Sequence, residues 1–207
     1  MIGLAIQWQK PLDGAEVVFG EDEHSKEGVL RARSDRFAAI ALEVSDFEAP
    51  VCILFVNSLG HEGLVAFATR FGVPSLGIPA EGDPPYSGAL MPLVEALRDD
   101  VEDVLFGNFA DIDHVQSINK IIKNAGIQPQ FDYVEGRYRF VLRPRTLSDF
   151  LLIEASMARD AGATARNCAH CGKAFLTGPM TGRRSTAKYC MDRCRVAAMR
   201  LRKDKKG

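Results

Sequence analysis

Four of the five cysteines in this 207-residue chain lie near its carboxyl end, as two close pairs. Two residues separate Cys168 from Cys171, and three separate Cys190 from Cys194. Four thiolates brought together by an intervening turn are the ligand set of a tetrahedral structural Zn²⁺ site. Because metal binding can fold a segment too short to bury an apolar core, the spacing predicts that these four cysteines bind one Zn²⁺ ion.

The residues around the two pairs predict how the chain brings them together. Gly172 follows the second cysteine and can take the positive φ of a tight turn around a metal, which indicates a zinc knuckle. The i to i+4 spacing of the second pair places both sulfurs on one face of a helix beginning near Cys190. Between the pairs we expect a strand at 175–176, a turn at 178–182 and a return strand at 188–190. Knuckle, hairpin and helix predict a treble-clef zinc finger.

The sequence favours a structural metal site over a catalytic site or a disulfide at these cysteines. A closed four-sulfur site has no open position for water or substrate, so its expected role is structural. A disulfide is the main alternative, but the start of the sequence lacks the basic segment of a signal peptide, and we expect a reducing, cytoplasmic location. His170 could replace one thiolate, although with four cysteines we expect it to be exposed. Cys52, in the apolar run 51–56, is expected in the core.

Charge is distributed unevenly along the chain. Of its 26 Lys and Arg residues, 12 lie in 161–207, together with only two of its 27 acidic residues. The net charge is therefore +10 in this tail and −11 in the first 160 residues. A Zn²⁺ ion with four thiolates carries a charge of −2, which would leave the tail at about +8. This asymmetry predicts a polyanionic partner for the tail.

Nucleic acid is the commonest polyanion, because clustered Arg and Lys gain from counterion release and arginine can grip base edges. We expect the helix to continue past Cys194, with Val196 and Met199 packing inward. The residues expected to contact nucleic acid are Arg183, Arg184, Lys188, Arg193, Arg195, Arg200, Arg202 and Lys203. The alternatives are a solvated tail without a specific target, or a tail that binds RNA, another protein or its own acidic body.

The tail also resembles the C-terminal zinc finger of the bacterial CGNR family. The matching elements are Cys-x-x-Cys-Gly-Lys-x-Phe at 168–175, Arg183-Arg184, Lys188-Tyr189-Cys190 and Cys194-Arg195. A weaker match is Phe55-Val56-Asn57-Ser58, which is similar to a stretch of the family's N-terminal domain. The resemblance implies a stress-response regulatory domain followed by a finger, in a transcription regulator that binds DNA. The name-giving Cys-Gly-Asn-Arg is absent, and the four cysteines are the positions that carry over.

The remainder of the chain has the composition of a globular domain. With 46% hydrophobic residues it can bury a substantial core, and it has no uncharged apolar run near the ~18–20 residues that a bilayer requires. We therefore expect no membrane association and two domains, an acidic body at 1–162 and a basic zinc finger at 163–207. A short hinge at 162–164 is expected between them.

Periodicity predicts a mixed α+β body. We expect strands at 2–8 and 15–19, and the apolar runs 37–44 and 51–56 are short enough for further strands. Helices are predicted at 62–70, at 90–105, after an N-cap at Asp111, and at 146–161, and a long connection rich in glycine and proline at 72–88. Asp111, Asp113 and His114 superficially suggest a metal site, but acidic residues in a first helical turn are better explained by the helix dipole.

A β-hairpin is predicted where 131–134 and 137–142 flank Glu135-Gly136. Its second strand alternates Tyr138, Phe140 and Leu142 with arginines. We expect the aromatic side chains to face the core, the alternative being that they stack on single-stranded nucleic acid.

Two classes of function follow. The first is a DNA-binding transcription regulator whose acidic body senses a ligand or dimerises. The second is a zinc-stapled adaptor whose basic tail binds protein or RNA. An enzyme is not expected, because the sequence has neither a serine–histidine–acid arrangement nor an HExxH motif. The oligomeric state is left open.

Overall fold

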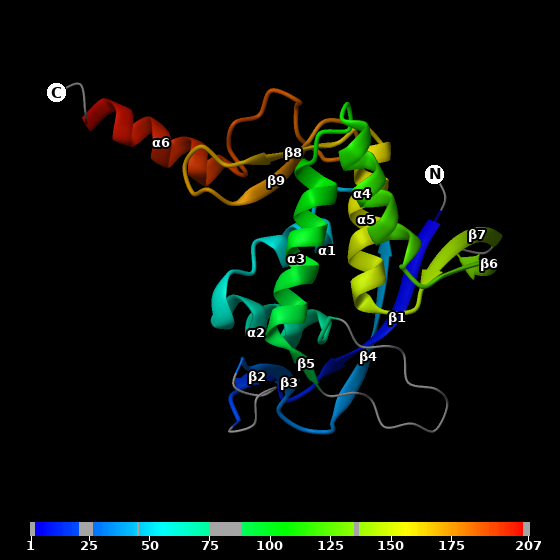
Figure 1. Cartoon of the computed structure of the whole chain (residues 1–207). Coiled ribbons are helices and arrows are strands. Elements are labelled where there is room, and N and C mark those ends of the chain that lie inside the picture. Colours follow the sequence, from blue (N-terminus) through cyan, green and yellow to red (C-terminus); the bar gives the residue numbers. More distant parts are fainter. Residues whose placement is uncertain (1–2, 21–26, 45, 75–87, 135–136, 205–207) are drawn as a thin grey trace.

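The computed structural model describes residues 3–20, 27–44, 46–74, 88–134 and 137–204 of the chain (Figure 1). It confirms the predicted α+β class, with helices packed over small β-sheets. The strands are β1 Gly3–Pro11, β2 Ala15–Val18, β3 Val29–Ala32, β4 Phe37–Val44, β5 Gly88–Leu90, β6 Ile127–Val134, β7 Arg137–Pro144, β8 Thr164–Asn167 and β9 Ala174–Thr177. The helices are α1 Val51–Val56, α2 Gly60–Phe71, α3 Met91–Phe106, α4 Ile112–Lys123, α5 Leu147–Asp160 and α6 Asp192–Asp204.

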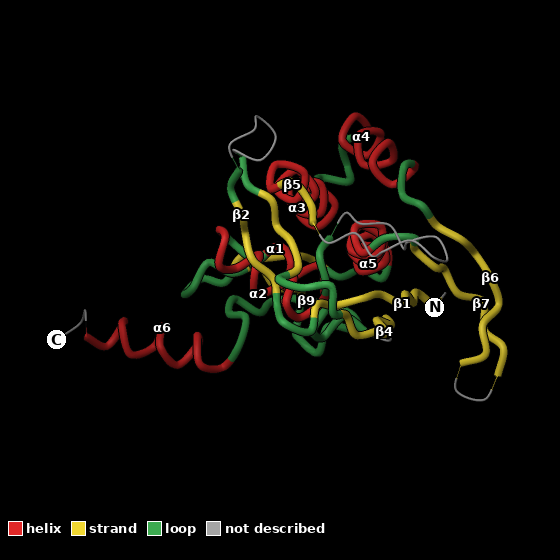
Figure 2. The backbone as a smooth tube through the Cα atoms, turned by 90° about the horizontal axis from the view of Figure 1, so that it is seen from below, coloured by secondary structure: helices red, strands yellow, loops and turns green. Residues whose placement is uncertain are grey.

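The largest sheet has the strand order β4-β1-β7-β6. Strands β1 and β4 are antiparallel along their whole length, and β6 and β7 form the predicted hairpin. The two halves of the sheet meet where β1 runs parallel to β7, and this pairing covers only Gly3↔Val141 and Leu4↔Leu142. Most of the hairpin therefore extends beyond the rest of the sheet, as the tube in Figure 2 shows.

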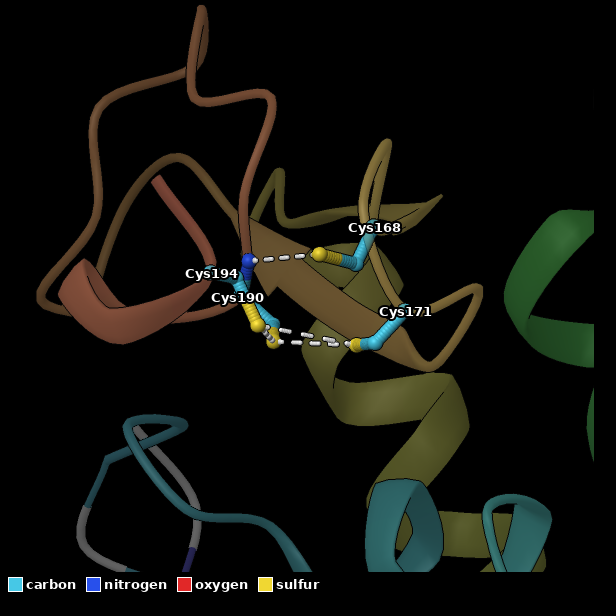
Figure 3. Close-up of side chains that lie close together, drawn as sticks. All are labelled: Cys168, Cys171, Cys190 and Cys194. Atoms are coloured by element: carbon cyan, nitrogen blue, oxygen red, sulfur yellow. Dashed lines mark hydrogen bonds between the residues drawn. The ribbon is translucent and has the colours of Figure 1, made fainter. Parts of the chain in front are cut away.

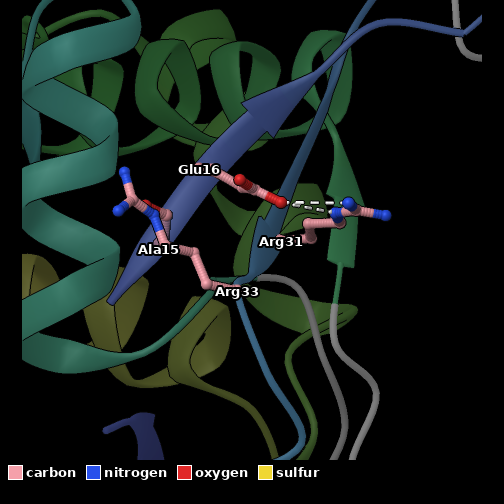
Figure 4. A network of polar contacts seen from close by, with 4 residues as sticks. All are labelled: Ala15, Glu16, Arg31 and Arg33. Carbon is pink, nitrogen blue, oxygen red and sulfur yellow. Dashed lines mark hydrogen bonds and ion pairs between the residues drawn. The ribbon is translucent and has the colours of Figure 1, made fainter. Parts of the chain in front are cut away.

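A second sheet, of order β2-β3-β5, packs near α2. The Arg31 side chain donates to the Glu16 carboxylate at 2.9 and 3.0 Å across β2 and β3, and Arg33 Nε donates to the Ala15 carbonyl at 3.2 Å (Figure 4). Ala15 N–H in turn donates to Thr69 Oγ1 of α2 at 2.9 Å. Because the Arg31–Glu16 pair is half exposed, it fixes strand register more than it adds stability.

The core lies between the helices and the main sheet. The apolar stripe predicted for the third helix is buried in α3, where Val94, Val101, Val104 and Leu105 are all fully inaccessible. It faces α5, whose Leu147 and Leu151 are equally buried. No helix in the described ranges has the length and apolarity needed to cross a membrane.

Helices α4 and α5 both begin at local caps. Asp111, the predicted N-cap, accepts a hydrogen bond from the Asp113 N–H at 3.0 Å at the start of α4. Thr146 and Asp149 form a reciprocal capping box at the start of α5, with hydrogen bonds of 3.0 and 3.1 Å. Both helices begin where expected because these caps use only neighbouring residues. The expected connection at 72–88 falls mainly outside the described residues.

The strand considered for residues 51–56 is wrong, because this run forms helix α1. The carboxylate of Glu154 on α5 accepts hydrogen bonds from two N–H groups at the start of α1, those of Val51 at 3.1 Å and Cys52 at 2.6 Å. The cap is thus supplied by a residue about a hundred positions away, which local periodicity cannot reveal. Cys52 is fully buried beside it, as predicted.

The expectation that the hairpin aromatics face the core is also wrong. Phe131, Tyr133 and Tyr138 are 69%, 67% and 74% exposed, and Phe140 is 41% exposed. On the same side of the hairpin, Ile127 and Leu142 pack against the core, and on the other side Val141 is buried and Arg143 pairs with Asp132 at 2.6 Å. The aromatic side chains are exposed because this part of the hairpin extends beyond the strand that pairs with its base.

We predict that Glu154 makes stability depend on pH. Burial raises the pKa of Glu154 from 4.5 to about 7, although the Cys52 and Val51 N–H groups oppose the shift. The folded state then binds this proton more tightly than the unfolded state. The free energy of unfolding should fall as pH rises from about 4.5 to about 7, by on the order of 3 kcal/mol from this group.

Urea unfolding across this pH range, compared with Glu154→Gln, checks the prediction. The variant cannot ionise, so the difference in unfolding free energy between the two proteins should change with pH. The amide introduced by Glu154→Gln also leaves one N–H of α1 without an acceptor, at a cost of about 1–3 kcal/mol. Glu43→Gln, on an exposed position of β4, is the matched control and should follow the wild type. Parallel pH profiles for wild type and Glu154→Gln would contradict the prediction.

Candidate metal centre

The first cysteine pair lies in the turn of a β-hairpin. Strands β8 and β9 pair antiparallel from Thr164↔Thr177 to Asn167↔Ala174, and Cys168 and Cys171 lie in the segment that joins them. The Gly172 N–H donates to the Cys168 carbonyl at 2.9 Å, and Gly172 has a φ of 73°. The predicted knuckle, with glycine in the left-handed region, is therefore present.

The second pair lies at the start of the last helix. Helix α6 begins at Asp192, two residues after Cys190, and Cys194 lies in its first turn, where its N–H donates to the Met191 carbonyl at 3.1 Å. The predicted return strand at 188–190 is wrong. Strand β9 pairs instead with β8, which precedes the knuckle, and the returning chain is held to the knuckle by a backbone hydrogen bond of 2.9 Å from Ala169 N–H to the Lys188 carbonyl.

The four sulfurs converge on one point (Figure 3). All four Sγ atoms lie within 4.8 Å of one another. The distances are 3.7 Å between Cys171 and Cys190, 3.6 Å between Cys190 and Cys194, and 3.8 Å between Cys194 and Cys171. A disulfide needs about 2.05 Å, so these sulfurs are unbonded thiols. The four cysteines could hold one metal ion.

The surroundings of the sulfurs favour thiolate at Cys168 and oppose it at Cys190 and Cys194. Burial tends to raise the pKa of Cys168, but backbone N–H groups of Cys171, Cys190 and His170 outweigh it and lower that pKa to about 6. The Cys190 N–H lies 3.4 Å from Cys168 Sγ. Burial raises the pKa of Cys190 and Cys194. Several clustered thiolates therefore need a nearby cation, which a bound metal ion would supply.

Three of the sulfur ligands are shielded from water and one is not. Cys168, Cys190 and Cys194 are buried at 4–6% exposure, whereas Cys171 is exposed. The adjacent His170 is exposed, as predicted, and is not among the converging groups.

The site is fixed to the body of the protein. The Asn57 side chain makes two hydrogen bonds with the backbone of Ala174, at 2.9 and 2.8 Å, and the Phe47 N–H donates to the Met180 carbonyl at 2.8 Å. Ala174 and Leu176 of β9 belong to the main core. Ala163, within the hinge expected at 162–164, is buried as well, so this segment is packed. The boundary between 162 and 163 stays a prediction.

Arg183, which was predicted to contact nucleic acid, instead makes hydrogen bonds within the protein. Its Nε donates to the Cys190 carbonyl at 3.2 Å, and its Nη1 donates to the Glu48 carbonyl at 3.3 Å. The guanidinium also lies 6.0 Å from the centre of the Phe175 ring. Arg183 thus connects the metal-binding segment with the body, a role that its position next to Arg184 in the sequence did not reveal.

The other predicted contact residues lie on the surface. Arg184, Lys188, Arg193 and Arg200 are at least partly exposed. Arg195 is exposed and paired with Asp192 at 3.2 Å, and exposed Arg202 donates to the Tyr189 hydroxyl at 2.5 Å. The side chain of Lys203, in the last turn of α6, lies outside the described residues. An open groove of about 430 Å³ beside the sulfurs is lined by Arg183, Arg184, Lys188, Tyr189 and Arg195, among others.

Helix α6 extends away from the body (Figure 1). Its buried side is formed by Cys194 and, one turn later, Ala198. The prediction that Val196 and Met199 pack inward is wrong, since they are 39% and 50% exposed. At 100° per residue Val196 lies on the side of the helix opposite Cys194 and Ala198, and Met199 lies about a quarter-turn or more from both, so burying the sulfur turns them to solvent.

Comparisons of the chain with protein-family models, curated proteins and solved structures found no match. The function of the site must therefore be inferred from its geometry.

We predict that Arg183 stabilises the attachment of the metal-binding segment. Arg183→Lys keeps the charge but cannot donate to both the Cys190 and Glu48 carbonyls, so about 1–3 kcal/mol of stability should be lost. Thermal unfolding of the full-length protein measures this, with exposed Arg184→Lys as the matched control. An equal effect of the two substitutions would argue against the bridging role.

Proposed function

We propose that this protein is a zinc-dependent, DNA-binding transcription regulator in which the metal site orients helix α6 toward the duplex. The observation that carries the proposal is the convergence of four cysteine sulfurs at the base of a helix bearing exposed arginines. The proposal assigns no catalytic step to the chain.

Zinc is the ion that best suits this ligand set. Tetrahedral coordination with Zn–S bonds of about 2.3 Å requires sulfurs about 3.8 Å apart. The Sγ–Sγ distances of 3.6, 3.7 and 3.8 Å among Cys171, Cys190 and Cys194 agree with that geometry, and Cys168 Sγ lies within 4.8 Å of each of them. Four thiolates and no open position favour a structural ion, and soft sulfur ligands disfavour Mg²⁺ and Ca²⁺.

The surface of α6 suits a nucleic-acid groove. Arg193 and Arg200 lie on one side of the exposed Val196 and Met199, and Arg195 and Arg202 lie on the other, by the angular spacing of an α-helix. The thirteen residues span about 20 Å, and an α-helix fits the major groove of B-DNA. Flanking arginines would reach phosphates on either side while the apolar centre meets the groove. The resemblance of the cysteine motif to CGNR fingers supports the same partner.

A second candidate function is an adaptor that binds protein or RNA through the same tail. The exposed apolar side chains of α6 favour a protein partner, since Val196, Met199 and Leu201 are 39%, 50% and 54% exposed. The arginines that flank these side chains on α6 favour a polyanionic partner instead. Salt dependence of binding separates the two functions.

We predict one tightly bound Zn²⁺ per chain. Elemental analysis of the full-length protein should find it, and substituting Cys171 and Cys194 by serine should abolish it. Cys52→Ala is the matched control, because this buried cysteine lies outside the cluster and its loss should leave the zinc content unchanged. Chelation should unprotect backbone amides of 168–204 to hydrogen exchange while α3 and α5 stay protected. Identical exchange with and without chelator would refute the zinc assignment.

We predict duplex DNA binding that falls steeply between about 50 and 200 mM salt. Replacing Arg195 and Arg202 by alanine should weaken binding and reduce the slope of log affinity against log salt by about two, because two phosphate contacts are removed. Fluorescence anisotropy with labelled duplexes measures both quantities. Lys120→Ala with Lys123→Ala, on exposed positions of α4, removes equal charge and should change neither.

Undetectable or salt-insensitive duplex binding by the zinc-loaded protein would contradict the DNA proposal. Binding of RNA or a protein in the same assay, lost in the Arg195 and Arg202 variant, would favour the adaptor. Selection of duplexes from random DNA then identifies the preferred sequence, with a four-serine variant as control.

A further inference from the structure

The β6–β7 hairpin carries an aromatic surface that the body does not cover. We define the aromatic face as the side chains of Phe131, Tyr133, Tyr138 and Phe140. They form two directly opposed cross-strand pairs, Phe131 with Phe140 and Tyr133 with Tyr138. The ring centres of the pairs are 5.5 and 5.3 Å apart, with the planes inclined at 68° and 67°. The rings thus form two edge-to-face pairs, one beside the other along the hairpin.

The aromatic face is exposed to solvent, although Ile127 and Leu142 on the same side of the hairpin pack against the core. The hairpin's ion pair between Arg143 and Asp132 is mostly shielded, with side chains 31% and 18% exposed, and Gln130 also donates to Asp132 at 2.8 Å. The aromatic face meanwhile points outward. Burial of Val141 and the shielded polar pairs on the other side fix the register, so the rings stay on the side that they share with Ile127 and Leu142, beyond the reach of the core.

The exposed area of the aromatic face reaches the lower limit for a homodimer interface. Aromatic side chains of this type offer ~150–250 Å² each, so the exposed fractions leave roughly 500 Å² of ring surface on each chain. This matches the largest apolar patches of soluble monomers, which are often functional. Two copies packed together would bury up to about 1,000 Å² from the rings alone, the least that a biological interface is expected to bury, and neighbouring side chains would add to it.

The residue types on the aromatic face favour an apolar partner. The residues on this side of the two strands are Ile127, Pro129, Phe131, Tyr133, Tyr138, Phe140, Leu142 and Pro144, and none is charged. A nucleic acid would find rings to stack on but no cation for its phosphates here. Phenylalanine and tyrosine without charge are typical of the buried centre of homodimer interfaces.

We propose that the aromatic face is a homodimer interface, in which it packs against the same face of a second copy across a two-fold axis. A two-fold axis allows one surface to serve both subunits. The hairpin and α6 extend from opposite sides of the body in both views (Figures 1 and 2), so dimerisation leaves the metal centre and α6 free. The inference does not rest on the proposed DNA function.

Sedimentation velocity of the full-length, zinc-loaded protein over a concentration series tests the interface. We expect reversible association from the 22.7 kDa monomer to twice that mass. Phe131→Glu and Tyr138→Glu should each weaken the dimer at least about tenfold, because a charge would be buried without a partner. The matched control is Ile112→Glu, which places the same charge on an apolar side chain that is also 67% exposed but lies on α4.

Circular dichroism shows whether the variants keep the fold, which is expected because the replaced rings are exposed. Independently of any substitution, amide exchange in β6 and β7 should slow as protein concentration rises through the dissociation constant. A wild type that stays monomeric, or a dimer that the hairpin substitutions leave intact, overturns the proposal. Single-stranded DNA binding by a monomer, lost in Phe131→Glu, would replace it with a stacking platform.

Discussion

The metal-binding segment depends on placing four sulfurs within 4.8 Å of one another, an arrangement that like charges oppose. Backbone N–H groups lower the pKa of Cys168, while burial raises the pKa of Cys190 and Cys194. A bound divalent cation would offset this repulsion. Because the knuckle and the first turn of α6 carry the sulfurs, such an ion would also set the direction of α6.

Hydrogen bonds attach the segment that carries the four cysteines to the body of the protein. Asn57 pairs with the backbone of Ala174, and Arg183 joins the carbonyls of Cys190 and Glu48. Leu176, two residues beyond Ala174, lies in the main core. The body and the metal centre therefore share side chains at their junction, and a change in one can reach the orientation of α6 through them.

The features predictable from the sequence are those fixed by nearby residues. The cysteine spacing, the glycine of the knuckle, the stripe of α3 and the starts of α4 and α5 all depend on residues within a few positions, and all are present. The errors arose where distant contacts decide. Glu154 caps α1 from a position about a hundred residues further along the chain, and the hairpin rings are exposed because β1 pairs only with the base of the hairpin. Likewise, Cys194 turns Val196 outward.

Strand β6 lies at the border of the main sheet, with β7 on one side only. Such a border is a template on which further chains can assemble into fibrils, and the neighbouring rings would strengthen that tendency. Pro129 within β6 counteracts it, because proline offers no N–H to an incoming strand and is one means by which natural sheets stop growing. The chain can therefore expose aromatic rings on this hairpin with a lower risk of unlimited aggregation.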